Sequence, residues 1–303
     1  MSPARCESLT YIVLMLPSPR VLLTIDYEPW FALVRRYDRL EDSLARRNLD
    51  GAFTLSAIDP ILEKLGDSKI SFYLVGEIAE WYPQIPQKII QAGHELGLHC
   101  QFHRSLVSRD ELALDIRAST SWVKDYGVRG YRAPMVGMSE SAYSLLEESG
   151  FVYSSSIYAP AGTLLQKGGV WEIPVSTLRF GRSAKTFIAP RQFTWGLLLG
   201  GEYPYGSSFS IGLMNKLIFP VLENELKKGF SPVLFMHPYE IVRPAHWASR
   251  LWRDVLSHPL LWPFTWNKSG FLTALVRNFP VSPIGTYLDE VMDLRGRAEG
   301  NAE

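Results

Sequence analysis

The chain has 303 residues, of which 47% are hydrophobic, 13% are aromatic and 20% are charged. This apolar content excludes a disordered chain, and two cysteines, Cys6 and Cys100, exclude a disulfide framework. The 31 basic residues are balanced by 31 acidic ones, so the positive excess typical of nucleic-acid binders is missing and no nucleic-acid partner is expected.

Short apolar runs that end in polar residues alternate with helical patterns along the chain. The expected strands are 20–26, 69–75, 94–99, 128–132, 151–155, 170–175, 232–237 and 280–284. The expected helices, which carry capping residues at their ends, are 57–65, 83–92, 108–125 and 139–150. Such alternation favours a parallel sheet, either doubly wound or closed into a barrel.

Reactive side chains stand at the ends of several expected strands, namely Asp26, His99, Arg132 and His237. A barrel assembles one site from many strand ends, whereas an open sheet gathers its site at a single crevice. No glycine-rich nucleotide-binding pattern follows a strand. We therefore expect an α/β barrel formed by one domain over 20–290. Residues 1–19 are expected to be a tail or a mis-assigned start, and 291–303 a disordered tail.

The segment from Gly93 to His103, GHELGLHCQFH, contains the densest group of reactive side chains. If the chain turns helical after His99, then His99 and His103 project from one face and can reach one divalent ion. By itself this spacing is equally compatible with two packing histidines. Further ligands are needed to decide.

The end of the first strand reads TIDYEPW and offers two carboxylates. Residues two apart on a strand point the same way, so Asp26 and Glu28 share a face while Tyr27 points to the other. One carboxylate with two histidines leaves a ligand position open for water, as in catalytic zinc sites. The alternative is that both acids only cap the turn before Pro29.

The motifs TIDYEPW, GHELGLHCQFH, GYRAPM, VWEIPV and VLFMHPYE occur in this order. Together they resemble the polysaccharide deacetylase family, which is carbohydrate esterase family 4 with its chitooligosaccharide-deacetylase homology domain, over about residues 20–290. The resemblance implies a distorted (β/α) barrel of about seven strands. It also implies metal-dependent removal of an N-acyl group, acetyl or formyl, from a sugar.

The resemblance carries over roles by position. His99 and His103 match the metal histidines, Asp26 the general base and His237 the general acid. Arg132 matches the arginine that orients the base, while Met135, Trp171 and Tyr27 are expected to contact substrate. His94 is expected to be structural.

Common members of the family have adjacent aspartates, and the second aspartate binds the metal. Tyr27 occupies that place in this chain. We therefore expect Glu28 to replace it as a metal ligand, as in an Asp-x-Glu branch of the family. The expected ion is Zn²⁺, with Co²⁺, Ni²⁺ or Mn²⁺ as alternatives.

The expected substrate is a polysaccharide, an oligosaccharide or a lipid-linked glycan. Two alternatives stay open. One is metal-independent C–N hydrolysis of a small cyclic amide, as in allantoinase-like relatives, and the other is a glycan-binding barrel without turnover.

Four tryptophans, Trp247, Trp252, Trp262 and Trp266, lie within one short segment. The segment 246–271 could therefore contact a membrane surface or a lipid-linked glycan, or it could be a packed excursion over the barrel rim. No convincing signal peptide is present, and we expect a cytoplasmic protein, with association to the membrane as an open alternative.

Overall fold

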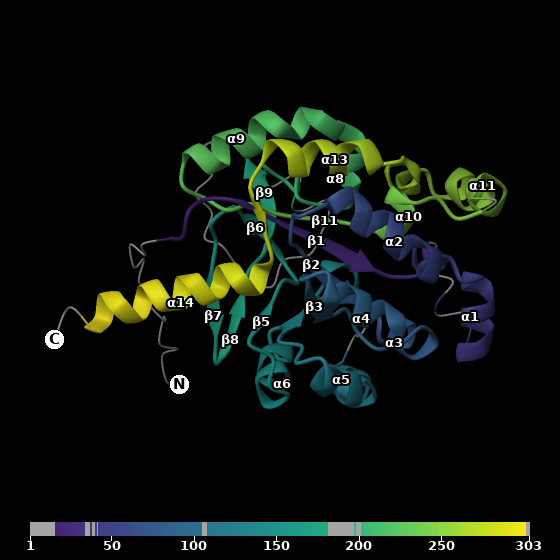
Figure 1. Ribbon diagram of the computed structural model, residues 1–303, viewed down its shortest axis with the longest axis horizontal. Coiled ribbons are helices and arrows are strands. Elements are labelled where there is room, and N and C mark those ends of the chain that lie inside the picture. The colour runs from purple at the N-terminus through teal and green to yellow at the C-terminus, as the bar shows by residue number, and fades with distance from the viewer. Residues whose placement is uncertain are drawn as a thin grey trace, which may run out of the picture.

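The computed structural model describes residues 16–33, 37, 40, 42–104, 108–180, 197, 201–245 and 247–300. A sheet of nine strands curls around an interior, with helices on its outside (Figure 1). Its order is β11-β1-β2-β3-β4-β5-β8-β7, and β12 also pairs with β1. The strands run β1 Val21–Tyr27, β2 Ser71–Leu74, β3 Glu95–Leu98, β4 Gly130–Tyr131, β5 Tyr153–Ser154, β7 Leu165–Lys167, β8 Val170–Glu172, β11 Val233–Met236 and β12 Val281–Ser282.

A second sheet of three strands, in the order β10-β9-β6, lies beside the β11 edge. Its strands are β6 Tyr158–Pro160, β9 Val175–Arg179 and β10 Glu202–Tyr203. The main-chain N–H of Val233 donates to the hydroxyl of Ser176, which ties β11 to β9. The expected strand 170–175 is thus two strands in two sheets, because Pro174 between them cannot donate to a ladder.

The helices cover the outer face of the main sheet and its ends (Figure 1). They are α1 Ser43–Asp50, α2 Phe53–Leu65, α3 Gly76–Trp81, α4 Gln84–Gln91, α5 Arg109–Asp125, α6 Ala142–Glu148, α8 Ser208–Met214, α9 Phe219–Lys227, α10 Pro238–Ile241, α11 Trp247–Ser257, α12 Trp262–Thr265, α13 Ser269–Asn278 and α14 Ile284–Gly300. Four 3₁₀ turns add η1 Trp30–Ala32, η3 Pro134–Val136, η4 Asn215–Ile218 and η5 Pro259–Leu261.

These features confirm the predicted distorted (β/α) barrel. The main sheet has more strands than the roughly seven expected, because β7 returns antiparallel to β8 and β12 adds to β1. The expected disordered tail is wrong for residues 291–300, which belong to α14. Residues 1–15 and 301–303 of the expected tails lie outside the described residues.

Strand β1 shows how the pattern of the chain builds the barrel. Alternate residues Val21, Leu23, Ile25 and Tyr27 join the cluster between sheet and helices, whereas Leu22 joins the cluster inside the curl. Since side chains alternate along a strand, Thr24 and Asp26 also face inward. The interior is therefore apolar at the start of the strands and polar at their ends.

Helix α14 closes the barrel at the end where the strands begin (Figure 1). Its residues Ile284, Tyr287, Leu288 and Val291 join the inner cluster. The main-chain N–H of Gly285 donates to Oε2 of Glu95, at 3.0 Å. The opposite, carboxyl-terminal end of the strands carries the polar interior, and parallel barrels place their sites at that end.

Gly97 gives a test of interior packing. A Cβ at this residue would lie 2.5 Å from a ring carbon of Tyr73 and 3.2 Å from the carbonyl oxygen of Gly130. We expect Gly97→Ala to lower the free energy of unfolding by about 1–3 kcal/mol, because an overpacked interior must shift. Denaturant unfolding measures this change.

The matched control is Gly296→Ala in α14, where a Cβ would meet no atom within 4 Å. This substitution should raise stability by about 0.5–1 kcal/mol, since alanine favours a helix. Equal effects of the two substitutions would contradict the packing argument.

Candidate metal and catalytic centre

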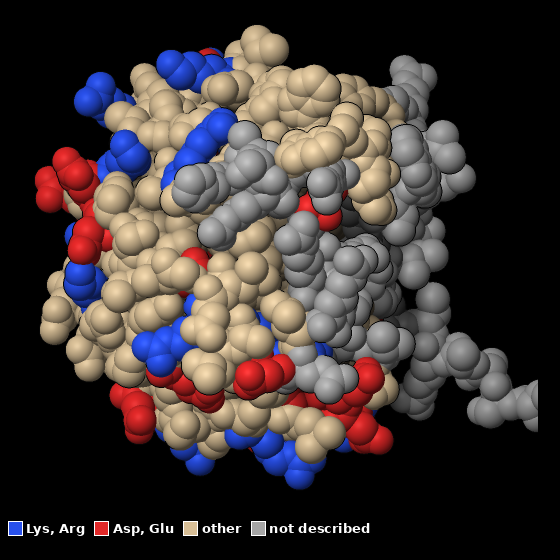
Figure 2. Space-filling view, turned by 90° about the vertical axis from the view of Figure 1, so that its right-hand side faces the viewer, with Lys and Arg blue, Asp and Glu red and all other residues tan. Residues whose placement is uncertain are grey.

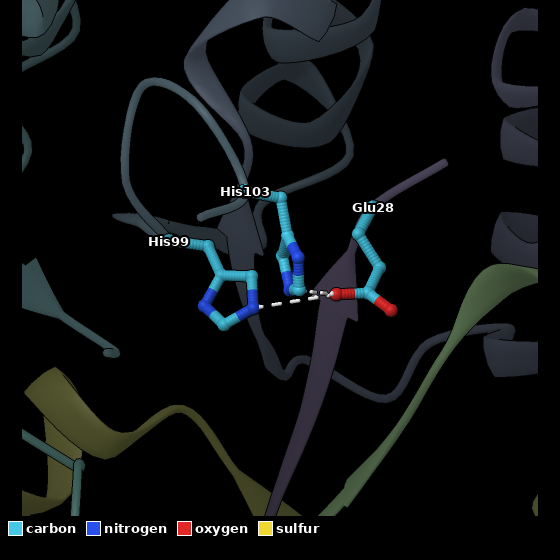
Figure 3. A group of neighbouring side chains, drawn as sticks. All are labelled: Glu28, His99 and His103. Carbon is cyan, nitrogen blue, oxygen red and sulfur yellow. Dashed lines mark ion pairs between the residues drawn. The ribbon is translucent and has the colours of Figure 1, made fainter. Parts of the chain in front are cut away.

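Glu28, His99 and His103 meet at the mouth of the barrel (Figure 3). Oε2 of Glu28 lies 2.6 Å from Nε2 of His103 and 3.5 Å from Nε2 of His99. The three donor atoms lie within 4.8 Å of one another. Glu28 follows β1, and both histidines follow β3, which is separated from β1 only by β2, so the carboxyl ends of these parallel strands bring the three side chains together.

The two histidines are brought together by a bend and not by the helical turn expected from their spacing. Cys100 has a φ of +95°, a conformation that departs from a helix. Oxygens of Asp115 in α5 accept the main-chain N–H groups of Gln101 and Phe102, at 2.7 and 3.0 Å. The loop is thus held by bonds to another helix, and this arrangement leaves the imidazole centroids 5.2 Å apart.

The orientation of His99 follows from its other ring nitrogen. Nδ1 of His99 lies 2.9 Å from the carbonyl oxygen of Arg132. A carbonyl only accepts hydrogen bonds, so the proton is on Nδ1. The lone pair of Nε2 therefore faces Glu28, which is the arrangement of a metal-binding histidine.

Glu28 is also bound from the opposite side, by Tyr239. The Tyr239 hydroxyl donates to Oε1 of Glu28 at 2.8 Å. The sequence analysis did not single out Tyr239, although it lies in the HPYE segment, two residues after His237. Tyr239 leaves only Oε2 of the carboxylate directed at the histidines.

The carboxylate of Glu28 is 3% exposed, which makes its charge depend on its neighbours. Burial by itself raises the pKa of Glu28, but the positive charges of His103 and His237 and the hydrogen bond from His103 outweigh it. The net pKa lies well below the usual value. Glu28 is therefore ionised at neutral pH.

Asp26 and Arg132 form a second buried pair beside this group. Nη1 of Arg132 lies 3.3 and 3.4 Å from the two carboxylate oxygens of Asp26. Nη2 donates to the hydroxyl of Ser155 at 2.9 Å, and the guanidinium lies over the ring of Tyr73. The pair is held rigidly inside the barrel, with one face of Asp26 occupied by Arg132.

His237 follows β11 and completes the group. Its Nε2 lies 3.7 Å from Oε1 of Glu28, and its ring stacks on that of Tyr239 with centroids 5.0 Å apart. Burial lowers the pKa of His237, but the carboxylates of Glu240, Glu28 and Asp26 raise it to a net value above the usual one. The imidazole is thus able to hold a proton near neutral pH.

The predicted substrate-binding residues have different outcomes. Met135 lies in the η3 turn after β4 and is 50% exposed, so it is at the rim close to Arg132. The prediction that Tyr27 contacts substrate is wrong, because its side chain lies in the outer core and its hydroxyl donates to the carbonyl of Thr54. Trp171 is also misplaced, since it lies in the inner cluster and its ring faces Arg295 of α14, at the closed end.

Two further residues of the motifs are structural. His94 packs against Phe72 with ring centroids 5.2 Å apart, and burial lowers its pKa to about 4. Glu172 of VWEIPV accepts the main-chain N–H groups of Ser156 and Ile157. Its carboxylate therefore holds the chain after β5 in place.

The donors fit a divalent metal. Two imidazole nitrogens and one carboxylate oxygen form the three-ligand set of catalytic zinc sites. The Nε2 atoms of the two histidines and the ionised oxygen lie close to one another (Figure 3). Nε2 of His237 lies 3.7 Å from Oε1 of Glu28, and the charge of Asp26 acts on the same imidazole, so a further carboxylate and a further imidazole lie near this group.

Comparisons with known proteins show what the chain is similar to. No family model matches the chain. A peptidoglycan deacetylase-like protein of Gibberella zeae is 25% identical over 182 residues, which are 56% of this chain and 53% of that protein. The match thus spans about half the length of that relative.

Two solved structures of deacetylases are similar to the chain, and the first of them shares the fold. A structure from Mycobacterium smegmatis that is named as a polysaccharide deacetylase has a TM-score of 0.50 and 19% identity, covering 89% of this chain and 97% of that one. The peptidoglycan deacetylase PdaC from Bacillus subtilis has a TM-score of 0.44 and 13% identity, covering 93% and 96%.

The fold is that of the polysaccharide deacetylase class. The predicted family is confirmed by these comparisons. The Asp-x-Glu branch stays a prediction.

The bend that carries His103 gives a second test. Asp115 is 3% exposed, and burial raises its pKa to about 6 against the opposing hydrogen bonds from Gln101 and Phe102. We expect Asp115→Asn to lower the free energy of unfolding at neutral pH by about 1–3 kcal/mol, because an amide cannot accept both N–H groups. Denaturant unfolding measures this loss.

The control is Asp125→Asn, at the exposed end of the same helix, which should change stability by less than about 0.5 kcal/mol. An Asp115→Asn protein as stable as the wild type would show that the loop is held in another way.

Proposed function

We propose that the protein is a metal-dependent hydrolase that removes an N-acyl group, acetyl or formyl, from a sugar of a glycan. The observation that supports it most is the convergence of Glu28, His99 and His103 next to the Asp26–Arg132 pair and His237. Deacetylase relatives support a glycan substrate and hydrolysis of a carbon–nitrogen bond.

In the proposed reaction, water adds to the acyl carbon and the C–N bond breaks. A divalent ion held by Glu28, His99 and His103, Zn²⁺ as first choice, would polarise the acyl carbonyl and acidify water at the site. Asp26 takes one proton from the attacking water while Arg132 keeps its carboxylate oriented. His237 donates the proton that the departing sugar nitrogen needs. The products are an amino sugar and acetate or formate.

The main-chain N–H of Met135 is our proposed hydrogen-bond donor to the acyl oxygen. Its position at the rim, in the turn that follows Arg132, supports this role. Donors directed at a developing oxyanion are among the largest contributions to acyl-transfer catalysis.

Zinc binding and turnover test the proposal separately. We expect the wild type to bind one Zn²⁺ per chain, and Glu28→Gln to weaken binding more than about 100-fold because it removes the charged ligand. Isothermal titration measures this. Asp26→Asn should keep zinc but lower kcat for N-acetylated chitooligosaccharides about 100- to 10,000-fold, followed by acetate release.

The control variant is Glu95→Gln, which alters a partly buried carboxylate at the closed end of the barrel. It should leave zinc affinity unchanged. Full activity after removal of zinc would favour the metal-independent alternative, and sugar binding without turnover in the wild type would favour a glycan-binding protein.

We also propose that the C-terminal part of the protein contacts an anionic membrane surface, as a lipid-linked glycan substrate would require. Among the described residues, no helix is both long and apolar enough to span a bilayer, so the contact would be peripheral. Large apolar side chains between 42% and 73% exposed support it: Leu213, Leu217, Trp252, Leu256, Leu260, Trp262 and Trp266.

These seven residues, which we call the apolar rim, lie on elements that pack on each other. Helix α8 approaches α12 so closely that a Cβ on Gly212 would lie 2.1 Å from the carbonyl oxygen of Pro263. Exposed Lys216 adjoins Leu217, and exposed Arg243 donates to the carbonyl of Thr265. Leucine and tryptophan next to basic side chains are typical of interfacial segments.

Charge on this side of the molecule agrees with such a contact. In Figure 2, Lys and Arg are prominent at the upper left of the face, whereas both signs of charge mix at its left edge and lower part. The upper part would thus present fewer carboxylates to an anionic surface than the lower part.

Vesicle flotation tests the membrane contact. We expect the wild type to float with phosphatidylcholine–phosphatidylglycerol vesicles. The double variant Trp252→Ser/Trp262→Ser should bind the vesicles about tenfold or more weakly, since it lacks two indoles that would be buried in the membrane interface. Leu114→Ser changes a residue that is 62% exposed on α5 and should float like the wild type.

A wild-type protein that stays unbound would refute the membrane contact. If it instead forms dimers that the double variant abolishes, a second copy of the chain is the occupant of the apolar rim.

A further inference from the structure

Behind His237 lies a group of buried polar side chains for which the proposed reaction has no role yet. Glu240, Lys268 and Ser208 are each at most 1% exposed. They come from three elements: α10, the residue that precedes α13, and the start of α8. Burying a carboxylate and an ammonium group is costly, so a fold keeps them there only where both are well bonded.

Each oxygen of Glu240 has its own set of partners. Oε1 accepts hydrogen bonds from Nζ of Lys268 and from the hydroxyl of Ser208. Oε2 accepts the main-chain N–H of His237 at 2.8 Å and lies 3.2 Å from Nδ1 of the same residue. The carboxylate is thus immobilised on one side by Lys268 and faces the imidazole with the other.

Lys268 is fixed as firmly as the carboxylate. Its Nζ donates to the hydroxyl of Ser208 at 2.7 Å, and its main-chain N–H donates to the carbonyl of Glu240 at 2.6 Å. Burial raises the pKa of Glu240, but the charges of Lys268 and His237 outweigh it and the net pKa is below the usual value. Glu240 is therefore an ionised acceptor.

An ionised carboxylate accepts hydrogen bonds and cannot donate them. Nδ1 of His237 is buried and forms no hydrogen bond of good geometry with the described residues, and its ion-pair partner is the carboxylate of Glu240 at 3.2 Å. A proton on Nδ1 is attracted to this carboxylate, whereas a lone pair there would be repelled by it, which favours the Nδ1–H tautomer. The opposite nitrogen, Nε2, is then directed at the candidate metal centre, where it lies 3.7 Å from Oε1 of Glu28. Histidines that transfer protons depend on such a partner to select the tautomer.

We propose that Glu240, held by Lys268 and Ser208, is a positioning residue that fixes His237 with Nδ1–H toward Glu240 and Nε2 toward the reacting atoms. This inference rests on the proposed function for its catalytic consequence, whereas the orientation of the ring stands without it. Lys268 acts through Glu240, because it holds the carboxylate in place and balances its charge. The residues that position His237 thus come from the HPYE segment itself and from one lysine in a distant part of the chain.

Two measurements test the proposal. Nitrogen-15 NMR of histidine-labelled, metal-free protein reports the tautomer, with the His237 signals assigned by their loss in His237→Gln. At a pH above the pKa of His237, where the ring is neutral, we expect the Nδ1–H tautomer in the wild type and a mixture of tautomers in Glu240→Gln, whose amide can also turn a donor to the ring. The second measurement is kinetics with N-acetylated chitooligosaccharides. We expect Glu240→Gln to have a kcat about 100-fold lower than that of the wild type and a KM within about twofold of it.

Glu172→Gln is the matched control, because Glu172 is a buried carboxylate that binds main-chain N–H groups and Tyr143 instead of His237. It should keep the wild-type tautomer. Lys268→Met leaves Glu240 without its counter-charge, and if it does not fold, the double variant Glu240→Gln/Lys268→Met removes both charges and restores the balance. The double variant should show the same tautomer mixture as Glu240→Gln.

The outcomes separate this inference from the proposed function. An unchanged Nδ1–H tautomer in folded Glu240→Gln would overturn the inference. If the wild type has no turnover, the proposed function fails, and the NMR experiment still decides the positioning of His237.

Discussion

The carboxylate of Glu28 is the interaction on which the rest of the site depends. It joins three loops, which follow β1, β3 and β11, through His103, His99 and Tyr239. Because the group is buried, each of its oxygens needs a partner, and the three loops must come together to supply them. The register of β1 makes this possible, since a shift by one residue would turn Glu28 into the outer core.

The barrel interior is divided between stability and chemistry. At the closed end, α14 adds apolar side chains to the inner cluster and Glu95 binds the start of that helix. At the open end, Asp26 with Arg132 and Glu28 with the histidines form two charged layers. The polar groups are ordered by hydrogen bonds from residues such as Ser155 and Asp115, so the reacting side chains have little freedom to turn away.

Much of the architecture could be predicted from local patterns. Each expected strand contains a strand of the structure, and the capping residues Ser108 and Glu111 begin α5 as expected. Local patterns failed where long-range contacts decide the backbone. The loop from His99 to His103 is bonded to α3 and α5, so its bend could not be read from the spacing of two histidines.

The sequence by itself determined the class of fold and pointed to the six charged or imidazole side chains that the structure brings to the site, because strand ends and two-residue alternation are local properties. They are Asp26, Glu28, His99, His103, Arg132 and His237. Tertiary structure decided which partners each of them meets. Tyr239 on Glu28, Glu240 with Lys268 behind His237, and the withdrawal of Tyr27 and Trp171 into the core all depend on contacts between segments far apart in the chain. Such contacts arise only when packing brings those segments together, and no local pattern records them.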